Sequence, residues 1–166
     1  ILIKKNHISF VTSNKGQTDG HKMRLSIYDY LMDIDFVNGL EVYQHKSPPF
    51  HHRRNDFFET SMFHISVENS KQKNYFTEKI IDCFASKTIP IYYGCPNLGD
   101  WFDMNGVVVL EPNQITQTLD SINEDFYYSK MESIEKNYEI AKQFHSENDV
   151  VPRLTNKIYM EVKNAI

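Results

Sequence analysis

The chain has 166 residues, with 18 Lys and Arg against 22 Asp and Glu, a formal net charge of -4 and a hydrophobic fraction of 40%. This length predicts one domain that buries its own core without disulfides or a metal. The acidic balance argues against a general nucleic-acid-binding protein, which would carry a basic surface. No apolar run approaches the roughly 20 residues that cross a bilayer, so no integral membrane segment is expected.

Alternating segments rich in β-branched and aromatic residues predict strands. The expected strands cover 7–12, a short stretch near 35–37, 62–67, 89–93 and 107–110, the last of which is expected to be buried on both faces. Apolar residues at helical spacing predict helices over 20–32 with Asp19 as the N-cap, from a cap at Thr77 to about Ser86, and over 113–122, 124–145 and 148–165. Residues 38–52 are expected to form a long loop and Arg53–Thr60 a short helix. This alternation favours an α/β domain with a largely parallel sheet.

Two polar segments lead from an expected strand into an expected helix. They are Ser13–Gly20, which is followed by Arg24, and Glu68–Lys79. Ligands bind at the carboxyl ends of parallel strands, and a helix N-terminus favours phosphate. Arg24 and Lys79 lie in the first turns of these helices, and two cations beside two helix ends would fit a pyrophosphate. The alternative is that Ser13–Gly20 is a solvated turn and that Glu78 and Lys79 form a solvated first turn.

Several other motifs do not indicate a site. Neither GxxxxGK[ST] nor GxGxxG follows a strand, which disfavours a P-loop ATPase and an ordinary NAD dehydrogenase. The run His51-His52-Arg53-Arg54 is expected in a surface loop, because adjacent histidines share no face and no further ligand completes a metal site. Asp33 and Asp35 are expected at the surface, and Cys83 is expected to be a small buried hydrophobe.

A longer pattern covers residues 63–97 and resembles the donor-binding signature of the α1,3-fucosyltransferases, glycosyltransferase family 10. Its anchors are Phe63, Glu68-Asn69-Ser70, Tyr75, Thr77-Glu78-Lys79, Pro90-Ile91-Tyr92, Gly94 and Pro96. The resemblance extends upstream to Phe10-Val11-Thr12-Ser13-Asn14, Arg24, Tyr28-Asp29 and Leu31, and downstream to Asp100-Trp101-Phe102.

This resemblance implies a Rossmann-like parallel sheet flanked by helices, like the C-terminal half of a GT-B glycosyltransferase. It implies transfer of fucose from GDP-fucose to a glycan acceptor with inversion, without a bound metal or cofactor. Arg24 and Lys79 would contact the GDP diphosphate, and Glu78 would accept hydrogen bonds from sugar hydroxyls. Asn69 and Tyr75 would also hold the nucleotide sugar. Glu68 would orient the loop that it begins.

The resemblance also bears on domain organisation. Residues 1–166 are expected to form a single nucleotide-sugar-binding domain, and the N-terminal acceptor domain, which would supply the catalytic base, is expected to be absent from this chain. Two alternatives stay open: a non-catalytic nucleotide-sugar-binding module, and a transferase of the same fold that uses another donor such as GDP-mannose. Localisation would be cytoplasmic or at the inner membrane for a bacterial or viral protein and the Golgi lumen for a eukaryotic one.

Overall fold

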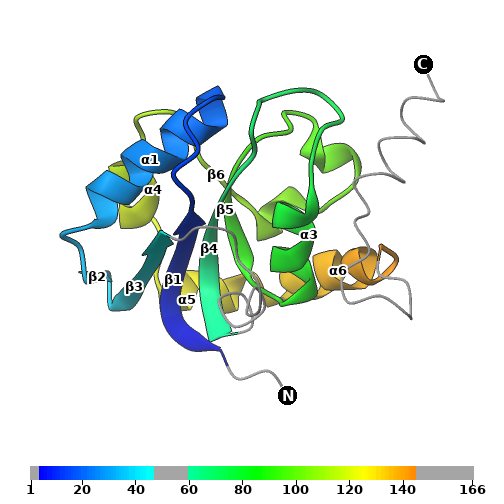
Figure 1. Cartoon of the computed structure of the whole chain (residues 1–166). Coiled ribbons are helices and arrows are strands. Elements are labelled where there is room, and N and C mark those ends of the chain that lie inside the picture. Colours follow the sequence, from blue (N-terminus) through cyan, green and yellow to red (C-terminus); the bar gives the residue numbers. More distant parts are fainter. Residues whose placement is uncertain (1–3, 47–59, 145–166) are drawn as a thin grey trace.

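The computed structural model describes residues 4–46 and 60–144 of the chain. Six strands form one sheet in the order β2-β3-β1-β4-β5-β6 (Figure 1). Every neighbouring pair is parallel except β2 and β3, which are antiparallel, so the expected largely parallel sheet is confirmed. The strands are β1 (Lys5–Thr12), β2 (Phe36–Val37), β3 (Leu40–Lys46), β4 (Ser61–Val67), β5 (Ile89–Tyr93) and β6 (Val108–Val109).

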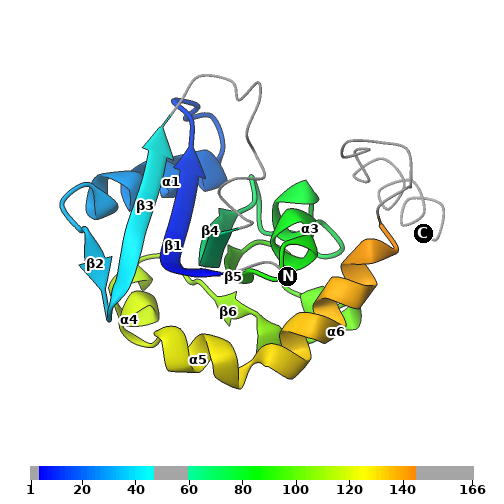
Figure 2. The same ribbon diagram turned by 90° about the horizontal axis from the view of Figure 1, so that it is seen from below.

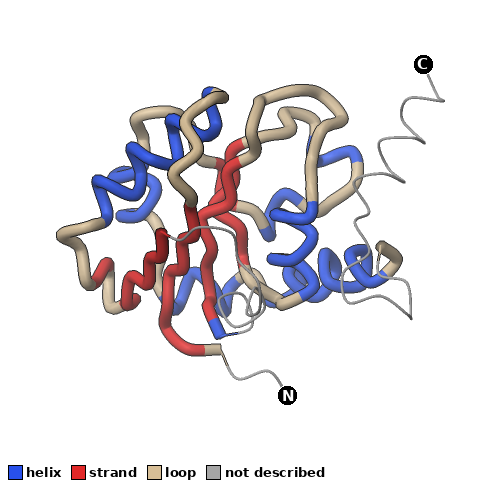
Figure 3. The backbone as a smooth tube through the Cα atoms, viewed as in Figure 1, coloured by secondary structure: helices blue, strands red, loops and turns tan. Residues whose placement is uncertain are grey.

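Helices flank the sheet, and Figure 3 shows the strands as a central layer between them. The helices are α1 (Asp19–Leu31), α3 (Glu78–Ala85), α4 (Ile115–Asp120), α5 (Glu124–Ser129) and α6 (Met131–Lys142), with short 3-10 turns at Leu98–Asp100 and Met104–Gly106. One core joins Phe10 and Phe63 of the sheet to α1 and to the α4–α6 segment. A second core joins Tyr92 of β5 to Ile80 on α3 and Ala141 on α6.

The strand order changes direction next to β1. The chain passes from β1 to β3 on one side, and β4 then pairs with β1 on the other side. In open α/β sheets, such a switch point leaves a crevice at the carboxyl ends of the two central strands. Here those ends are Thr12 and Val67, so the switch point lies between the two polar segments singled out in the sequence.

The expected long loop over 38–52 is wrong for its first half, because Leu40–Lys46 forms β3 beside β1. A two-residue turn at Asn38-Gly39 connects β2 to β3, and both residues have positive φ, 49° and 81°. Asn-Gly is the pair that this kind of hairpin turn prefers. The rest of that expected loop lies outside the described residues, as do most of the expected Arg53–Thr60 helix and the whole of the 148–165 helix.

Two expectations near the C-terminal end need correction. Strand β6 covers only two residues at the sheet edge, and Val109 is 54% exposed, so the 107–110 run is not buried on both faces. The helix expected over 124–145 is broken at Lys130, where α5 ends and α6 begins. Figure 2 shows the change of direction between the two helices. Helix α5 contributes Tyr127 to the first core, and α6 contributes Ile134 to the first core and Ala141 to the second.

Helix α1 sits directly against the end of β4. Its N-cap is Thr18 rather than the expected Asp19, because the Thr18 hydroxyl accepts the His21 backbone N–H at 3.1 Å. The next residue but one, Gly20, donates its backbone N–H to the Asn69 carbonyl at 3.2 Å. A Cβ at position 20 would lie 1.9 Å from the Glu68 carbonyl oxygen. The absence of a side chain at Gly20 therefore sets how closely α1 approaches the β4 end.

Gly20→Ala is expected to lower the free energy of unfolding by about 1–3 kcal/mol, because the added methyl group meets backbone that cannot move aside. Denaturant titration followed by circular dichroism measures this loss. Gly16→Ala is the matched control, since its Cβ would meet only Leu25 at an ordinary 3.8 Å. Equal stability of the two variants would contradict the close approach of α1.

Candidate functional site

At the switch point, the carboxyl ends of β1 and β4 lead toward the N-terminal ends of α1 and α3, and we call the region where these ends meet the crevice. Each expected site residue comes from an element that borders it: Arg24 from α1, Glu68 and Asn69 from the β4 end, Tyr75 from the following loop, and Glu78 and Lys79 from the first turn of α3. Hydrogen bonds, ion pairs or mutual electrostatic effects connect all six. The structure therefore brings the six residues together, although Arg24 and the 68–79 segment are more than forty residues apart in the sequence.

Arg24 is buried and is held by the segment that follows β4. Its guanidinium donates one hydrogen bond to the Val67 carbonyl and another, of 2.8 Å, to Asn69 Oδ1. Burial lowers the pKa of Arg24, while Glu68 and Tyr75 oppose this shift. An arginine nevertheless stays charged at neutral pH, and its remaining N–H groups can bind an anion. Its orientation is therefore set by the protein before any ligand arrives.

Glu68 joins the end of β4 to the beginning of α3. Its carboxyl group is fully buried, and Thr77 donates to it twice, from the backbone N–H at 2.9 Å and from the hydroxyl at 2.8 Å. Burial raises the pKa of Glu68, an effect that Lys79 and the two Thr77 bonds partly offset. A Cβ at Gly94 would lie 2.5 Å from Glu68 Cγ, so the glycine leaves room for this side chain.

Thr77 is the N-cap of α3, as the sequence predicts, and it also positions Lys79. The Thr77 hydroxyl lies 3.4 Å from the Lys79 backbone nitrogen and 3.0 Å from Lys79 Nζ. The ammonium group of Lys79 lies 3.4 Å from Glu68 Oε2 and 3.5 Å from Glu78 Oε1. The Lys79 ammonium group is thus held between one buried and one partly exposed carboxyl group.

Tyr75 is half-buried next to this group of charges. Burial and the neighbouring Glu68 and Glu78 raise the pKa of its phenol, and Arg24 acts in the opposite direction. The phenol therefore keeps its proton at neutral pH and can donate a hydrogen bond.

Aromatic packing and amide hydrogen bonds hold the loop that carries Tyr75. Phe76 packs edge-on against Trp101 and Phe102, with ring centroids 5.3 and 5.6 Å apart. Asn97 accepts the Asn74 backbone N–H at 2.9 Å and donates to the Asn74 side chain at 2.7 Å. These contacts connect the loop that precedes α3 to the segment that follows β5.

His21 also borders the crevice, although the sequence analysis does not identify it as a site residue. It completes a capping box with Thr18: the Thr18 backbone N–H donates to its Nδ1 at 3.2 Å. The side chain is buried, and burial, together with Arg24, Lys15 and Lys79, lowers its pKa. Its position one helical turn before Arg24 is the signal that could have identified it, since residues three apart share a helix face.

The described residues contain no group of three His, Cys, Asp or Glu side chains that could hold a metal ion. The run His51-His52-Arg53-Arg54 lies outside them. Within the same residues, none of the helices combines the length and the hydropathy that a membrane span requires. Asp33 and Asp35 are exposed and Cys83 is buried, as expected.

Comparison with known proteins adds independent findings. The family profile described as glycosyltransferase family 10 (fucosyltransferase) C-term matches residues 1–150. An alpha-(1,3)-fucosyltransferase FucT of Helicobacter pylori is 33% identical over 106 residues, which are 64% of this chain and 21% of that protein. Solved structures of alpha1,3-fucosyltransferase with GDP and with GDP-fucose match with TM-scores of 0.50 and 0.51, at 23% and 22% identity.

The two solved structures are matched over 95% of this chain and 46% of their own length. The chain thus spans about a fifth of the Helicobacter pylori protein and just under half of each solved structure. At these identities the structural matches show that the fold is shared, which confirms the expected likeness to part of a GT-B glycosyltransferase.

Thr77→Ala is expected to lower the free energy of unfolding by about 1–2 kcal/mol, because it removes the α3 cap and one donor to the buried Glu68. Thr77→Ser keeps the hydroxyl and serves as the matched control, with a loss well below that of the alanine variant. Thermal and denaturant unfolding measure both. Equal losses in the two variants would mean that the methyl group, and not the hydroxyl, matters.

Glu68→Gln is expected to change how stability depends on pH. In the fold the pKa of Glu68 is raised, whereas in the unfolded chain it lies near 4.5. The stability that this group contributes is therefore fully present below the unfolded pKa and is lost as pH rises through the folded pKa. Glutamine does not ionise, so the difference in free energy of unfolding should move in favour of the variant as pH rises from about 4 to about 8. A difference that is constant over this range would contradict the raised pKa.

Proposed function

The chain belongs to glycosyltransferase family 10, the fucosyltransferases, and from this we propose that its described residues form the donor-binding part of an enzyme that transfers fucose from GDP-fucose to a glycan. The observation that carries the proposal is the pair of cations, Arg24 and Lys79, at two helix N-termini on either side of the sheet's switch point. The diphosphate of a nucleoside diphosphate carries the negative charge that two such cations beside helix N-termini favour. The solved GDP and GDP-fucose complexes of proteins with this fold support the same donor.

In the proposed complex, Arg24 and Lys79 bind the diphosphate and Glu78 accepts hydrogen bonds from fucose hydroxyls. A carboxylate suits a sugar because each of its oxygens can accept a bond. Tyr75 and Asn69 hold the nucleotide sugar from the loop between β4 and α3, and Asn69 also orients Arg24 through their 2.8 Å bond. Glu68 is too deeply buried to reach a sugar, so we assign it the positioning of Thr77 and Lys79.

The proposed reaction is a single displacement at the anomeric carbon with inversion. An acceptor hydroxyl oxygen forms a bond to fucose C1 while the bond from C1 to the phosphate oxygen breaks. The electron pair of the broken bond leaves with GDP, and the hydroxyl proton passes to a base. Negative charge grows on the diphosphate, where Arg24, Lys79 and the two helix ends stabilise it. We assign the base to no described residue and expect it in the part of the relatives that this chain does not span.

The donor assignment predicts that Arg24→Ala and Lys79→Ala each weaken GDP binding by about tenfold or more, because each removes a charge-assisted contact to the diphosphate. Isothermal titration calorimetry on the whole chain measures the affinity, and Lys142→Ala, on α6 far along the chain, is the control. Arg24→Lys keeps the charge but not the planar fork, so it should restore only part of the loss.

Several results would overturn the assignment. The unaltered chain could fail to bind GDP, or it could bind UDP as tightly as GDP. Unchanged affinity in both alanine variants, with folding confirmed by circular dichroism, would remove the diphosphate from this crevice. Competition of GDP-fucose against GDP-mannose identifies the donor sugar, and tighter binding of GDP-mannose would replace fucose in the proposal.

A further inference from the structure

We propose that His21 donates a hydrogen bond from its Nε2–H to the donor diphosphate, as a third protein contact beside Arg24 and Lys79. This inference rests on the proposed function, because it assigns a further binding residue to the same crevice. It is built on the position of the His21 ring and on its hydrogen bonding.

The hydrogen bond to Thr18 determines which ring nitrogen of His21 carries the proton. A backbone N–H can only donate, so at 3.2 Å from the Thr18 nitrogen, Nδ1 must be an acceptor. A neutral imidazole that accepts at one nitrogen carries its hydrogen on the other. The capping box therefore makes Nε2 a donor. In the part of the chain that the structure describes, Nε2 has no hydrogen-bond partner, so this donor is available to a ligand.

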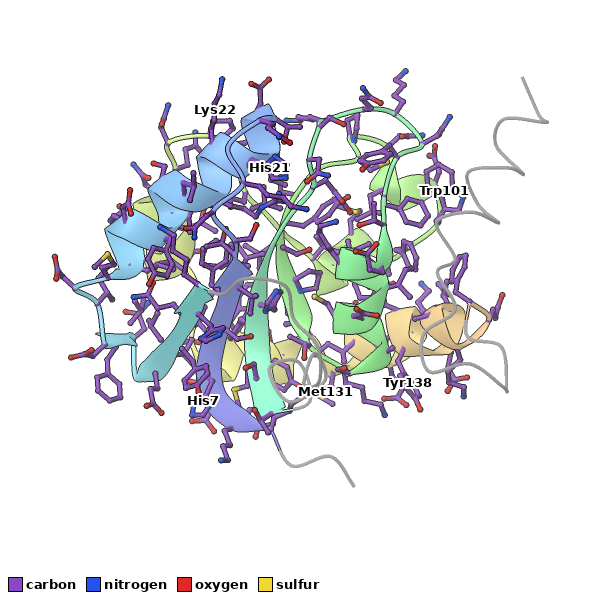
Figure 4. All side chains as sticks on the ribbon, in the orientation of Figure 1. His7, His21, Lys22, Trp101, Met131 and Tyr138 are labelled. Carbon is purple, nitrogen blue, oxygen red and sulfur yellow. The ribbon has the colours of Figure 1, made fainter. Side chains whose placement is uncertain are left out.

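The place of His21 on α1 brings its side chain close to Arg24 and Lys79, the two proposed diphosphate contacts. Only 8% of the residue is exposed, and Arg24 lies one turn further along the same face of the helix. That face meets the β4 end, where Gly20 donates to the Asn69 carbonyl and Arg24 donates to the Asn69 side chain. In Figure 4, His21 lies on the side of α1 that faces the loop between β4 and α3, whereas the exposed Lys22 lies on its outer side.

The charges around His21 favour an anion. The groups that act on its ring are Arg24, Lys15 and Lys79, and all three lower its pKa, in addition to burial. The ring therefore stays neutral near pH 7, which preserves the bond from Thr18. An N–H donor close to three cations lies where negative charge is favoured, and a phosphate oxygen would supply both the charge and the acceptor.

Capping alone does not explain this residue. The usual third residue of a capping box is Glu or Gln, which offers the required acceptor. A glutamate here would place a negative charge beside Arg24 and Lys79 and would repel a diphosphate. Histidine provides the acceptor at Nδ1 and a donor at Nε2 without a charge, so it serves the helix end and the ligand together.

The test compares His21→Ala with His21→Gln by calorimetry against GDP, GMP and guanosine. Alanine removes both the acceptor and the donor, whereas glutamine can keep the capping bond and offers an amide N–H. We expect His21→Ala to weaken GDP binding by about tenfold and His21→Gln to recover most of that loss. Guanosine, which has no phosphate, should bind equally to all variants. Lys22→Ala, which removes an exposed cation from the neighbouring position, should leave GDP affinity unchanged.

A spectroscopic readout separates binding from capping. In ¹⁵N NMR of the unaltered chain, His21 should show a protonated Nε2 whose resonance moves when GDP is added and stays in place with guanosine. Wild-type GDP affinity in His21→Ala would overturn the inference, as would an equal loss in His21→Gln when its thermal stability matches the unaltered chain. A resonance that GDP does not move would also overturn it.

The two proposals fail separately. Where the unaltered chain binds GDP but His21→Ala binds it as tightly, the proposed function stands and the His21 contact falls. Where the unaltered chain binds inorganic pyrophosphate in a His21-dependent manner but does not bind GDP, the phosphate contact stands and the proposed donor falls.

Discussion

The buried carboxyl group of Glu68 is the contact on which the crevice depends. Glu68 directly follows the last residue of β4, and its carboxyl group accepts the backbone N–H of Thr77, the N-cap of α3. The same carboxyl group lies beside Lys79, so one side chain determines where a helix begins and where a cation rests. A second connection, from Gly20 and Arg24 to Asn69 and Val67, ties α1 to the same strand end. Both helices therefore take their position from the last residues of one strand.

Elements with strong local patterns could be predicted from the sequence. Strands β4 and β5 and the Thr77 cap follow from apolar alternation and from a capping residue before an apolar helix face. Strand β3 is hard to predict from the sequence, because only Leu40 is fully buried in it and the following prolines indicate a loop, although Asn38-Gly39 is a strong hairpin signal. The break at Lys130 is hard to predict, because no glycine or proline interrupts the helical pattern over 124–142.

Some residues of the candidate site could likewise be predicted from the sequence, and others could not. Arg24, Asn69 and Lys79 stand out because they lie in recognisable segments at helix ends, and the structure brings them together. The sequence offered no direct sign that β1 and β4 are neighbours, since that pairing joins distant segments. His21 does not stand out in the sequence for a local reason: with Asp19 as the expected cap, position 21 has no capping partner. Moving the start of α1 by one residue gives this histidine both its hydrogen bond and its place in the crevice.

The concentration of positive charge around α1 also affects the protein without a ligand. Arg24, Lys79 and Lys15 all bear on His21, and like charges so arranged repel one another across the junction between two helices. The fold tolerates this repulsion through the rigid contacts of Glu68 and Asn69. The stability of the protein without ligand should therefore depend on the anion in solution. At equal ionic strength, sulfate should stabilise the folded protein more than chloride does, because a multivalent oxyanion would bind the crevice, which only the folded chain has.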